Sequence, residues 1–314
     1  RRASFHSTYT VGDKIGEGGM GQVYWVQHTS LGSRHALKRI KKSLDSFESC
    51  VNEVAALSVL DHPHIIKLIE NFGDEGPYLY LVFELCEGPD LYDRIKTEAA
   101  GKMTERDASL ALRHMLKALQ CCHSHFRGHY DIKPENFMYK DKSLNNLVMI
   151  DLGQSDRFRY CKTAVGGTVG YEAPEFFRST YGPEGDVFSC GIVLWMMLTG
   201  TGFGQDSVIM QREKQFSTML KHRIHYADTL EVSAYAQDLM TMMLQYDRHA
   251  RPTVKEALNH AFSNESYETE RLDPVWTDQS CFKEAISICE MLPATFQNVV
   301  AEPILKRMAR RVIA

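Results

Sequence analysis

The stretch HYDIKPEN, residues 129–136, places an aspartate, a lysine and an asparagine within six positions. Fifteen residues after its asparagine, the tripeptide DLG at 151–153 follows the apolar run LVMI at 147–150. That run predicts a short strand ending just before a second aspartate. A single Asp or Asn in a loop usually serves turn geometry. The ordered set of carboxylates, amide and lysine indicates a chemical site instead.

These residue types suit phosphoryl transfer. That reaction needs an oriented hydroxyl, neutralised phosphate charge and in-line geometry, with little covalent help from the protein. One carboxylate can orient the hydroxyl, and a second carboxylate with the amide can hold Mg²⁺ through oxygen atoms. A lysine can offset charge on the transferred group.

A glycine-rich segment, IGEGGMGQV at 15–23, lies upstream between two expected strands. Its glycines would let backbone N–H groups approach phosphate oxygens, although a plain glycine-rich hairpin has the same pattern. A dinucleotide-binding fold would need a helix directly after it. Here a second strand follows instead. Lys38 comes next, in a further expected strand, and Glu53 on the following expected helix could pair with that lysine.

The apolar pattern changes along the chain. Short alternating segments at 9–11, 23–26, 35–38 and 78–83 predict a small, mostly antiparallel sheet, interrupted by one helix at 47–60. Beyond Leu91 the apolar period is about 3.6, which predicts a mainly helical second half. Gly88-Pro89 marks a hinge, so we expect an α+β chain of two lobes with a cleft between them.

Together these motifs resemble the protein kinase family from Tyr9 to about Phe262. The resemblance implies the bilobal kinase fold, with an N-terminal extension at 1–8, an N-lobe at 9–86, a C-lobe at 87–263 and a C-terminal extension at 264–314. It implies a Ser/Thr enzyme using ATP and Mg²⁺, with Asp131, Lys133 and Thr168 catalytic and Asn136 and Asp151 binding the metal. It further implies that Asp186 fixes the catalytic-loop backbone and that Arg251 pairs with Glu175.

The resemblance also assigns nucleotide-binding roles. Glu84 and Cys86 would offer backbone groups to adenine, with Phe83 as gatekeeper, while Asp90 and Glu135 are placed to favour basic residues near the target hydroxyl. The full set for the nucleotide side is Ile15, Gly16, Glu17, Gly18, Gly19, Met20, Gly21, Gln22, Val23, Ala36, Lys38, Glu53, Phe83, Glu84, Cys86, Asp90 and Met138.

Two positions depart from the family pattern. Tyr130 stands where arginine is usual, and Leu152 where phenylalanine is usual. Arginine normally reads an activation-loop phosphate through paired hydrogen bonds that a phenol does not make. We therefore expect activity without activation-loop phosphorylation. A pseudokinase scaffold is the alternative that these departures favour, and the retained lysine, aspartates and asparagine oppose it.

The C-terminal segment suggests regulation. Residues 303–314 form a basic amphipathic pattern that suits a packed helix, a calmodulin-like partner or autoinhibition. It resembles the start of the junction region in calcium-dependent protein kinases, which implies an EF-hand domain beyond Ala314. Regulation by a separate calmodulin is the alternative.

Composition excludes several other classes. The formal net charge of −4 argues against a general nucleic-acid binder. The longest apolar run, 190–198, is too short to span a membrane, and the N-terminus lacks a signal pattern. The eight cysteines include no C-x-x-C pair, as expected for reduced thiols in a cytoplasmic protein. Membrane association through segments absent from this chain stays open.

Overall fold

The computed structural model describes residues 4–18, 21–73, 76–98, 101–158, 167–178, 181–204, 211–229 and 232–263. Gly19, Met20 and the expected C-terminal extension with its basic helix at 303–314 lie outside these ranges. The described chain forms two compact units. The first comprises residues up to Asp61 together with 66–85, and the second comprises 62–65 together with the residues from Cys86 onward.

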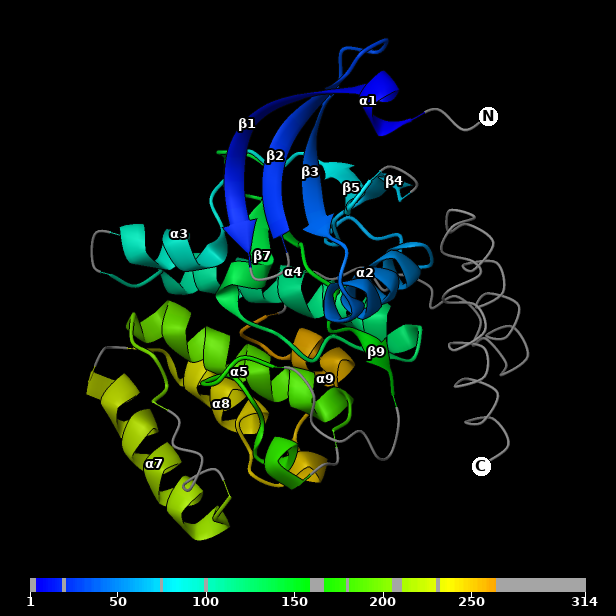
Figure 1. The fold of residues 1–314 in the computed structure, drawn as a ribbon. Helices are drawn as coiled ribbons and strands as arrows, with labels where there is room; N and C mark the ends of the chain where they lie inside the picture. The colour runs from blue at the N-terminus through cyan, green and yellow to red at the C-terminus, as the bar shows by residue number, and fades with distance from the viewer. Residues whose placement is uncertain are drawn as a thin grey trace. The chain divides into compact units, whose positions relative to one another are not determined.

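The first unit contains a five-stranded antiparallel sheet (Figure 1). The strand order is β1-β2-β3-β5-β4, and each pair of neighbours is antiparallel. The four segments predicted to be strands lie within four of these strands, while β4 was not predicted. Their bounds are β1 (Tyr9–Gly18), β2 (Gly21–His28), β3 (Arg34–Lys41), β4 (Leu68–Phe72) and β5 (Tyr78–Glu84).

One long helix, α2 (Leu44–Leu57), accompanies the sheet. Ser43 caps its first turn by accepting the Ser46 N–H, and the Ser46 hydroxyl in turn accepts the Ser43 N–H. This reciprocal cap satisfies two backbone donors and starts the helix three residues before the predicted Phe47. The helix also ends earlier than predicted, at Leu57 rather than Leu60.

The described part of the expected N-terminal extension, residues 4–8, is packed into the first unit. It forms the short helix α1 (Phe5–Thr8), and the Phe5 side chain is completely buried. The Phe5 ring stacks on Tyr80 with centroids 4.3 Å apart and meets Phe72 edge-on at 5.6 Å. Phe5 therefore belongs to the same apolar cluster as Tyr9, Val26, Leu37, Tyr80 and Val82.

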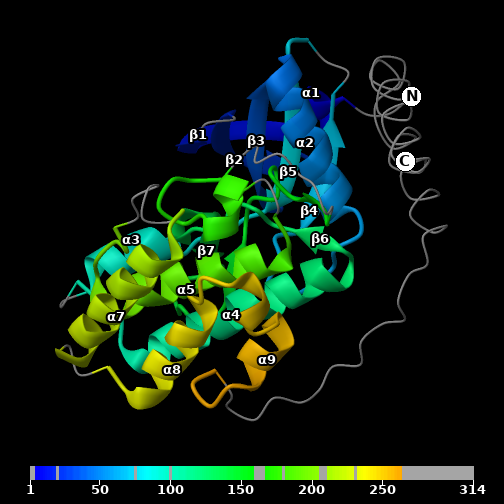
Figure 2. The same cartoon turned by 90° about the horizontal axis from the view of Figure 1, so that it is seen from below.

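The second unit is mainly helical, with two small two-stranded sheets, β6-β9 and β7-β8 (Figure 2). Sheet in one unit and helices in the other confirm the predicted α+β class. The helices of the second unit are α3 (Leu91–Thr97), α4 (Glu105–Ser124), α5 (Pro183–Thr199), α7 (Glu213–Thr229), α8 (Ala234–Met243) and α9 (Val254–Asn259). The strands are β6 (Arg127–Gly128), β7 (Phe137–Tyr139), β8 (Leu147–Met149) and β9 (Asp156–Arg157), and the 3-10 turns are η1 (Pro134–Asn136), η2 (Pro174–Arg178) and η3 (Arg248–Ala250).

Helices α4 and α5 pack together in the core of this unit. The apolar stripe predicted for α4 is buried at each position, from Ala108 to Leu119. Helix α5 is apolar around most of its circumference, as a helix enclosed by protein requires, and it ends at Gly200 in the left-handed conformation. None of the helices within the described ranges has the length and apolar character needed to cross a membrane. Among the described cysteines, Cys50, Cys122 and Cys190 are buried free thiols.

Candidate functional site

Lys38 and Glu53 form an ion pair in the first unit. The Lys38 Nζ lies 2.7 Å from Glu53 Oε2, and the Glu53 side chain is only 1% exposed. Lys38 comes from β3 and Glu53 from α2, so the pair also ties the helix to the sheet. Because both partners are largely buried, the ammonium is held in a single place rather than moving in solvent.

The sheet register places further predicted residues beside Lys38. Lys38 is opposite Val23 on β2 and opposite Leu81 on β5, and Ala36 is opposite Phe83. Directly opposed residues share a face of the sheet, and so do residues two apart along one strand. Val23, Ala36, Lys38 and Phe83 therefore line one face of the sheet, with apolar side chains beside the Lys38 ammonium.

The glycine-rich segment closes the β1–β2 hairpin. Gly16 is opposite Val23, Glu17 is opposite Gln22, and Gly18 is opposite Gly21. A Cβ at Gly21 would run into the backbone carbonyl of Arg39, so close packing on β3 already requires glycine there. A Cβ at Gly16 would make only ordinary contacts. Ile15 is 51% exposed at the start of this hairpin.

Asp131, Lys133 and Thr168 form a closed triangle of hydrogen bonds in the second unit. Lys133 Nζ donates to Asp131 Oδ2 and to Thr168 Oγ1, each at 2.8 Å. The Thr168 hydroxyl donates to the other carboxylate oxygen, Asp131 Oδ1, at 2.6 Å. Thr168 is 37 residues away from Asp131 in the chain, and the structure brings the two together.

The triangle decides the ionisation of Asp131. Burial acts to raise the pKa of Asp131, but hydrogen bonds from Lys133 and Thr168, together with the lysine charge, lower it below the usual value of a carboxyl. Asp131 is therefore a carboxylate at neutral pH. A fixed, ionised carboxylate with a cation beside it can orient and accept a proton from a hydroxyl group.

Asn136 and Asp151 are brought together by the β7–β8 pair. Asn136 comes directly before β7 and Asp151 shortly after β8, and antiparallel pairing places these two ends side by side. The Ile150 N–H donates to the Asn136 carbonyl at 2.9 Å. Asn136 Nδ2 donates to the Asp131 carbonyl at 2.7 Å, which directs the amide oxygen away from that contact. The pair supplies oxygen donors of the kind that Mg²⁺ binds.

Asp186 holds the backbone just before Asp131. This residue is completely buried in the first turn of α5, and its two oxygens accept the N–H groups of His129 and Tyr130, each at 2.9 Å. The same carboxylate lies 3.0 Å from His123 Nε2 on α4. His129 Nδ1 in turn accepts the Asp131 N–H at 3.2 Å. Burial lowers the pKa of His129, consistent with a neutral imidazole as the acceptor.

Three predicted nucleotide residues have structural partners of their own. Asp90 caps α3 by accepting the Asp93 N–H at 2.8 Å, and burial raises the pKa of Asp90. Met138 lies in β7 and forms an isolated bridge with Asp90. The Glu84 N–H donates to the Lys67 carbonyl at 3.0 Å. Cys86 is half-buried at the start of the second unit.

Comparison with known proteins agrees with this geometry. Residues 9–263 match the family model of the protein kinase domain. The chain belongs to the protein kinase domain family. This chain is 32% identical over 321 aligned residues to Calcium-dependent protein kinase 8 of Oryza sativa subsp. japonica. It is 31% identical over the same length to Calcium-dependent protein kinase 8 of Arabidopsis thaliana. These alignments cover 98% of this chain but only 55% and 56% of the relatives, so the chain spans about half of their length.

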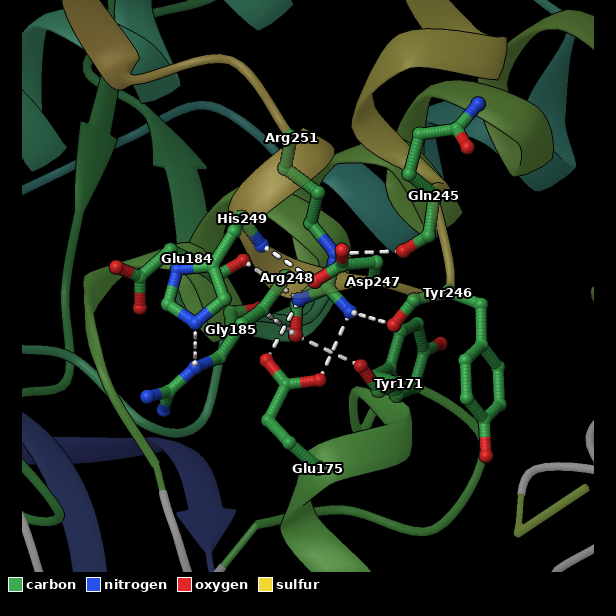
Figure 3. Close-up of polar contacts among 11 residues, drawn as sticks. Tyr171, Glu175, Glu184, Gly185, Gln245, Tyr246, Asp247, Arg248, His249 and Arg251 are labelled. Carbon is green, nitrogen blue, oxygen red and sulfur yellow. Dashed lines mark hydrogen bonds and ion pairs between the residues drawn. The ribbon is translucent and has the colours of Figure 1, made fainter. Parts of the chain in front are cut away.

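The kinase domain also contains the implied pair of Arg251 and Glu175. The two terminal nitrogens of Arg251 donate to the two oxygens of Glu175 at 2.6 and 2.8 Å. The guanidinium also donates to backbone carbonyls, and Figure 3 shows it surrounded by these acceptors. The carbonyls belong to Glu184 (3.0 Å), Gln245 (2.7 Å) and Tyr246 (3.2 Å).

Two contacts of the kinase domain were not predicted from sequence. His123 reaches the Asp186 carboxylate from α4, and Tyr181 lies against the Tyr130 ring with centroids 5.1 Å apart. Neither His123 nor Tyr181 stands in a local motif, because each contact joins segments more than 50 residues apart. For the Tyr181 contact, the unusual tyrosine at 130 was the one feature of the sequence that could have suggested a packing partner, since a buried ring needs a surface to pack against.

Proposed function

We propose that this kinase domain transfers the γ-phosphoryl group of ATP to serine and threonine hydroxyls of protein substrates. The contact of Lys133 with both Asp131 and Thr168 carries the proposal. It combines a carboxylate that can accept a hydroxyl proton with a cation that can face the transferred group. Thr168 fixes the second oxygen of that carboxylate, so the proton acceptor keeps one orientation.

Asn136 and Asp151 fit a Mg²⁺ ion. Mg²⁺ commonly takes one or two protein oxygens and completes its shell with water and substrate phosphates. When bound, Mg²⁺ would neutralise charge on the phosphates.

The first unit supplies the remaining nucleotide contacts in this proposal. Lys38, held by Glu53, would pair with the α- and β-phosphates. The backbone of the β1–β2 hairpin would approach the phosphates, as its glycines permit. Ala36 and Val23 would contact the adenine ring, and Phe83 would limit the depth of its pocket. Backbone groups of Glu84 and Cys86 would contact the adenine ring.

Substrate choice and regulation extend the proposal. Asp90 and Glu135 carry carboxylates that would favour basic residues near the target hydroxyl. The names of both relatives suggest regulation by calcium, and the basic segment 303–314 suits binding to an EF-hand domain or to calmodulin. We further place the protein in the cytoplasm.

Transfer of radiolabelled phosphate to a library of basic peptides tests the function. Asp131→Asn should lower kcat by at least about a hundredfold because the proton acceptor is lost. Asp141→Asn is the matched control, since Asp141 is an exposed loop carboxylate that bonds only to the Ser143 region. Equal activity in wild type and Asp131→Asn would contradict the proposal. Absence of transfer by the wild type at saturating Mg-ATP would support a scaffold instead.

Truncation tests the regulatory part separately. A version ending at Ser263 retains the whole segment matched by the family model. Higher activity than that of the full chain would support autoinhibition by the residues removed. Unchanged activity would contradict it without affecting the proposed catalytic roles.

A further inference from the structure

Tyr130 occupies an unusual backbone position beside the catalytic aspartate. Its φ of 66° lies in the left-handed region, which is uncommon for a bulky residue and persists only when the surroundings hold it. The side chain is 8% exposed. Its N–H donates to Asp186 at the start of α5, and its ring meets Tyr181 edge-on at 75° just before the same helix. The backbone and the ring of Tyr130 are thus both held from one end of α5.

Two glycines make room for these rings. A Cβ at Gly128 would overlap the Tyr130 ring, and a Cβ at Gly185 would overlap the Tyr181 ring. Neither glycine has a positive φ, so backbone conformation does not require glycine at either place. Gly185 lies inside a helix, where glycine costs stability relative to alanine. Ring packing accounts for both glycines.

The aromatic contacts continue towards Thr168. Phe176 in η2 meets the Tyr181 ring at 5.9 Å and 88°, and a Cβ at Gly167 would come within 3.4 Å of the Phe176 ring. Gly167 directly precedes Thr168, which bonds to Asp131. The rings of Tyr130, Tyr181 and Phe176 therefore connect the backbone on both sides of the Asp131–Thr168 contact.

We propose that Tyr130, Tyr181 and Phe176 form an aromatic brace that positions Asp131 and Thr168 without a phosphate group. A buried arginine at 130 would need an anionic partner to hold it in place. An aromatic ring can instead be held by packing against neighbouring rings and against glycine backbone. Tyr130 is thus a positioning residue. This inference rests on the proposed kinase function and explains how the site forms without a modified activation loop.

Single variants test the brace in phosphatase-treated protein. Tyr130→Leu should lower kcat for a peptide substrate by about tenfold, the scale of a lost aromatic contact, while the KM for ATP changes less than about twofold. Tyr130→Phe keeps the ring and should recover most of that kcat. Phe203→Leu is the matched control, because Phe203 also forms an edge-on aromatic pair, with Trp195, which lies nine residues beyond Asp186 along α5. That control should leave kcat unchanged.

A double-mutant cycle separates the ring contact from general loosening. Gly128→Ala should lower kcat because the added methyl displaces the Tyr130 ring. In the Tyr130→Leu background the same change should have little further effect, since the smaller side chain leaves room. If Tyr130→Leu does not fold, Tyr181→Leu replaces it as the variant with which Gly128→Ala is combined. Equal effects of Gly128→Ala in both backgrounds, or full kcat in Tyr130→Leu, would overturn the brace.

Hydrogen exchange gives a readout that does not depend on catalysis. Tyr130→Leu should speed exchange of the backbone amides of 129–131 at least about tenfold, because local opening becomes easier. Tyr130→Phe should not. If the wild type transferred no phosphate but this pattern appeared, the proposed function would fail and the brace would stand. Unchanged exchange in Tyr130→Leu would overturn the brace even in an active enzyme.

Discussion

The carboxylate of Asp131 accepts from the Lys133 ammonium and the Asn136 amide at one oxygen and from the Thr168 hydroxyl at the other. The ammonium of Lys133 places a positive charge beside the carboxylate, whereas the hydroxyl of Thr168 fixes the orientation of the carboxylate. Both lower the pKa of Asp131 against the opposing effect of burial. The same contacts therefore decide the orientation of the carboxylate and the pH at which it loses its charge.

Thr168→Val should shift the acid limb of the pH–activity profile to higher pH. The folded protein holds the pKa of Asp131 below its usual value, so activity is lost as pH falls through that lowered pKa. Removing the hydroxyl raises the pKa, and protonation then begins at higher pH. At neutral pH, kcat should fall about tenfold or more because the carboxylate is less well oriented. Thr168→Ser keeps the hydroxyl and is the control, and an unmoved acid limb in Thr168→Val would contradict this role.

At the scale of elements, α1 is the shortest of the described α-helices, yet it makes a large buried contact. Its four residues could not persist alone, since isolated short helices are unstable in water. Ser4 accepts the Ser7 N–H, and the Phe5 ring fills a gap among Tyr80, Tyr9 and Phe72. Burial of one ring thus anchors the whole N-terminal segment to the sheet.

Phe5→Ala should lower the free energy of unfolding by about 3 to 5 kcal/mol, the usual cost of removing a fully buried phenylalanine. Chemical denaturation followed by circular dichroism measures it. Tyr235→Ala is the control, since the Tyr235 side chain is 64% exposed on α8 and should change stability by less than about 0.5 kcal/mol. A small effect of Phe5→Ala would mean that α1 contributes little to the folded state.

At the scale of the molecule, Arg251 joins segments of the second unit that are far apart in sequence. The buried guanidinium bonds to Glu175 in η2, to Glu184 at the start of α5 and to carbonyls just before η3. It also lies over the Phe188 ring, 4.8 Å from its centroid. These contacts fill most of the donor positions of the guanidinium, which offsets much of the cost of its burial.

Arg251→Met should destabilise the protein by about 3 to 5 kcal/mol because it leaves the buried Glu175 carboxylate without its cation. The double variant Arg251→Met/Glu175→Met should recover a large part of that loss, since neither charge then remains buried. Thermal and denaturant unfolding of both variants measure the difference. Equal destabilisation by the single and double variants would show that the backbone contacts of Arg251 matter more than the ion pair.

Prediction from sequence succeeded where the information was local. The motifs at 15–23 and 129–136 and the apolar periods indicated the α+β class, because strands and helices bury their faces at characteristic spacings. The order of the expected strand and helix suggested Glu53 as the partner of Lys38, whereas the role of Asp186 came from resemblance. Burial of Phe5 and the contact of Tyr130 with Tyr181 could not be predicted. The sequence around an aromatic residue does not indicate which distant residues it packs against.

Gly128 also limits the order in which this chain could have changed during evolution. Any side chain at 128 overlaps the Tyr130 ring, so tyrosine at 130 could be accepted only after, or together with, glycine at 128. The reverse path is restricted as well, because a larger residue at 128 is not tolerated while the tyrosine remains. Homologues that carry tyrosine at the position of 130 should therefore carry glycine at the position of 128, a linked pair that ancestral reconstruction can look for.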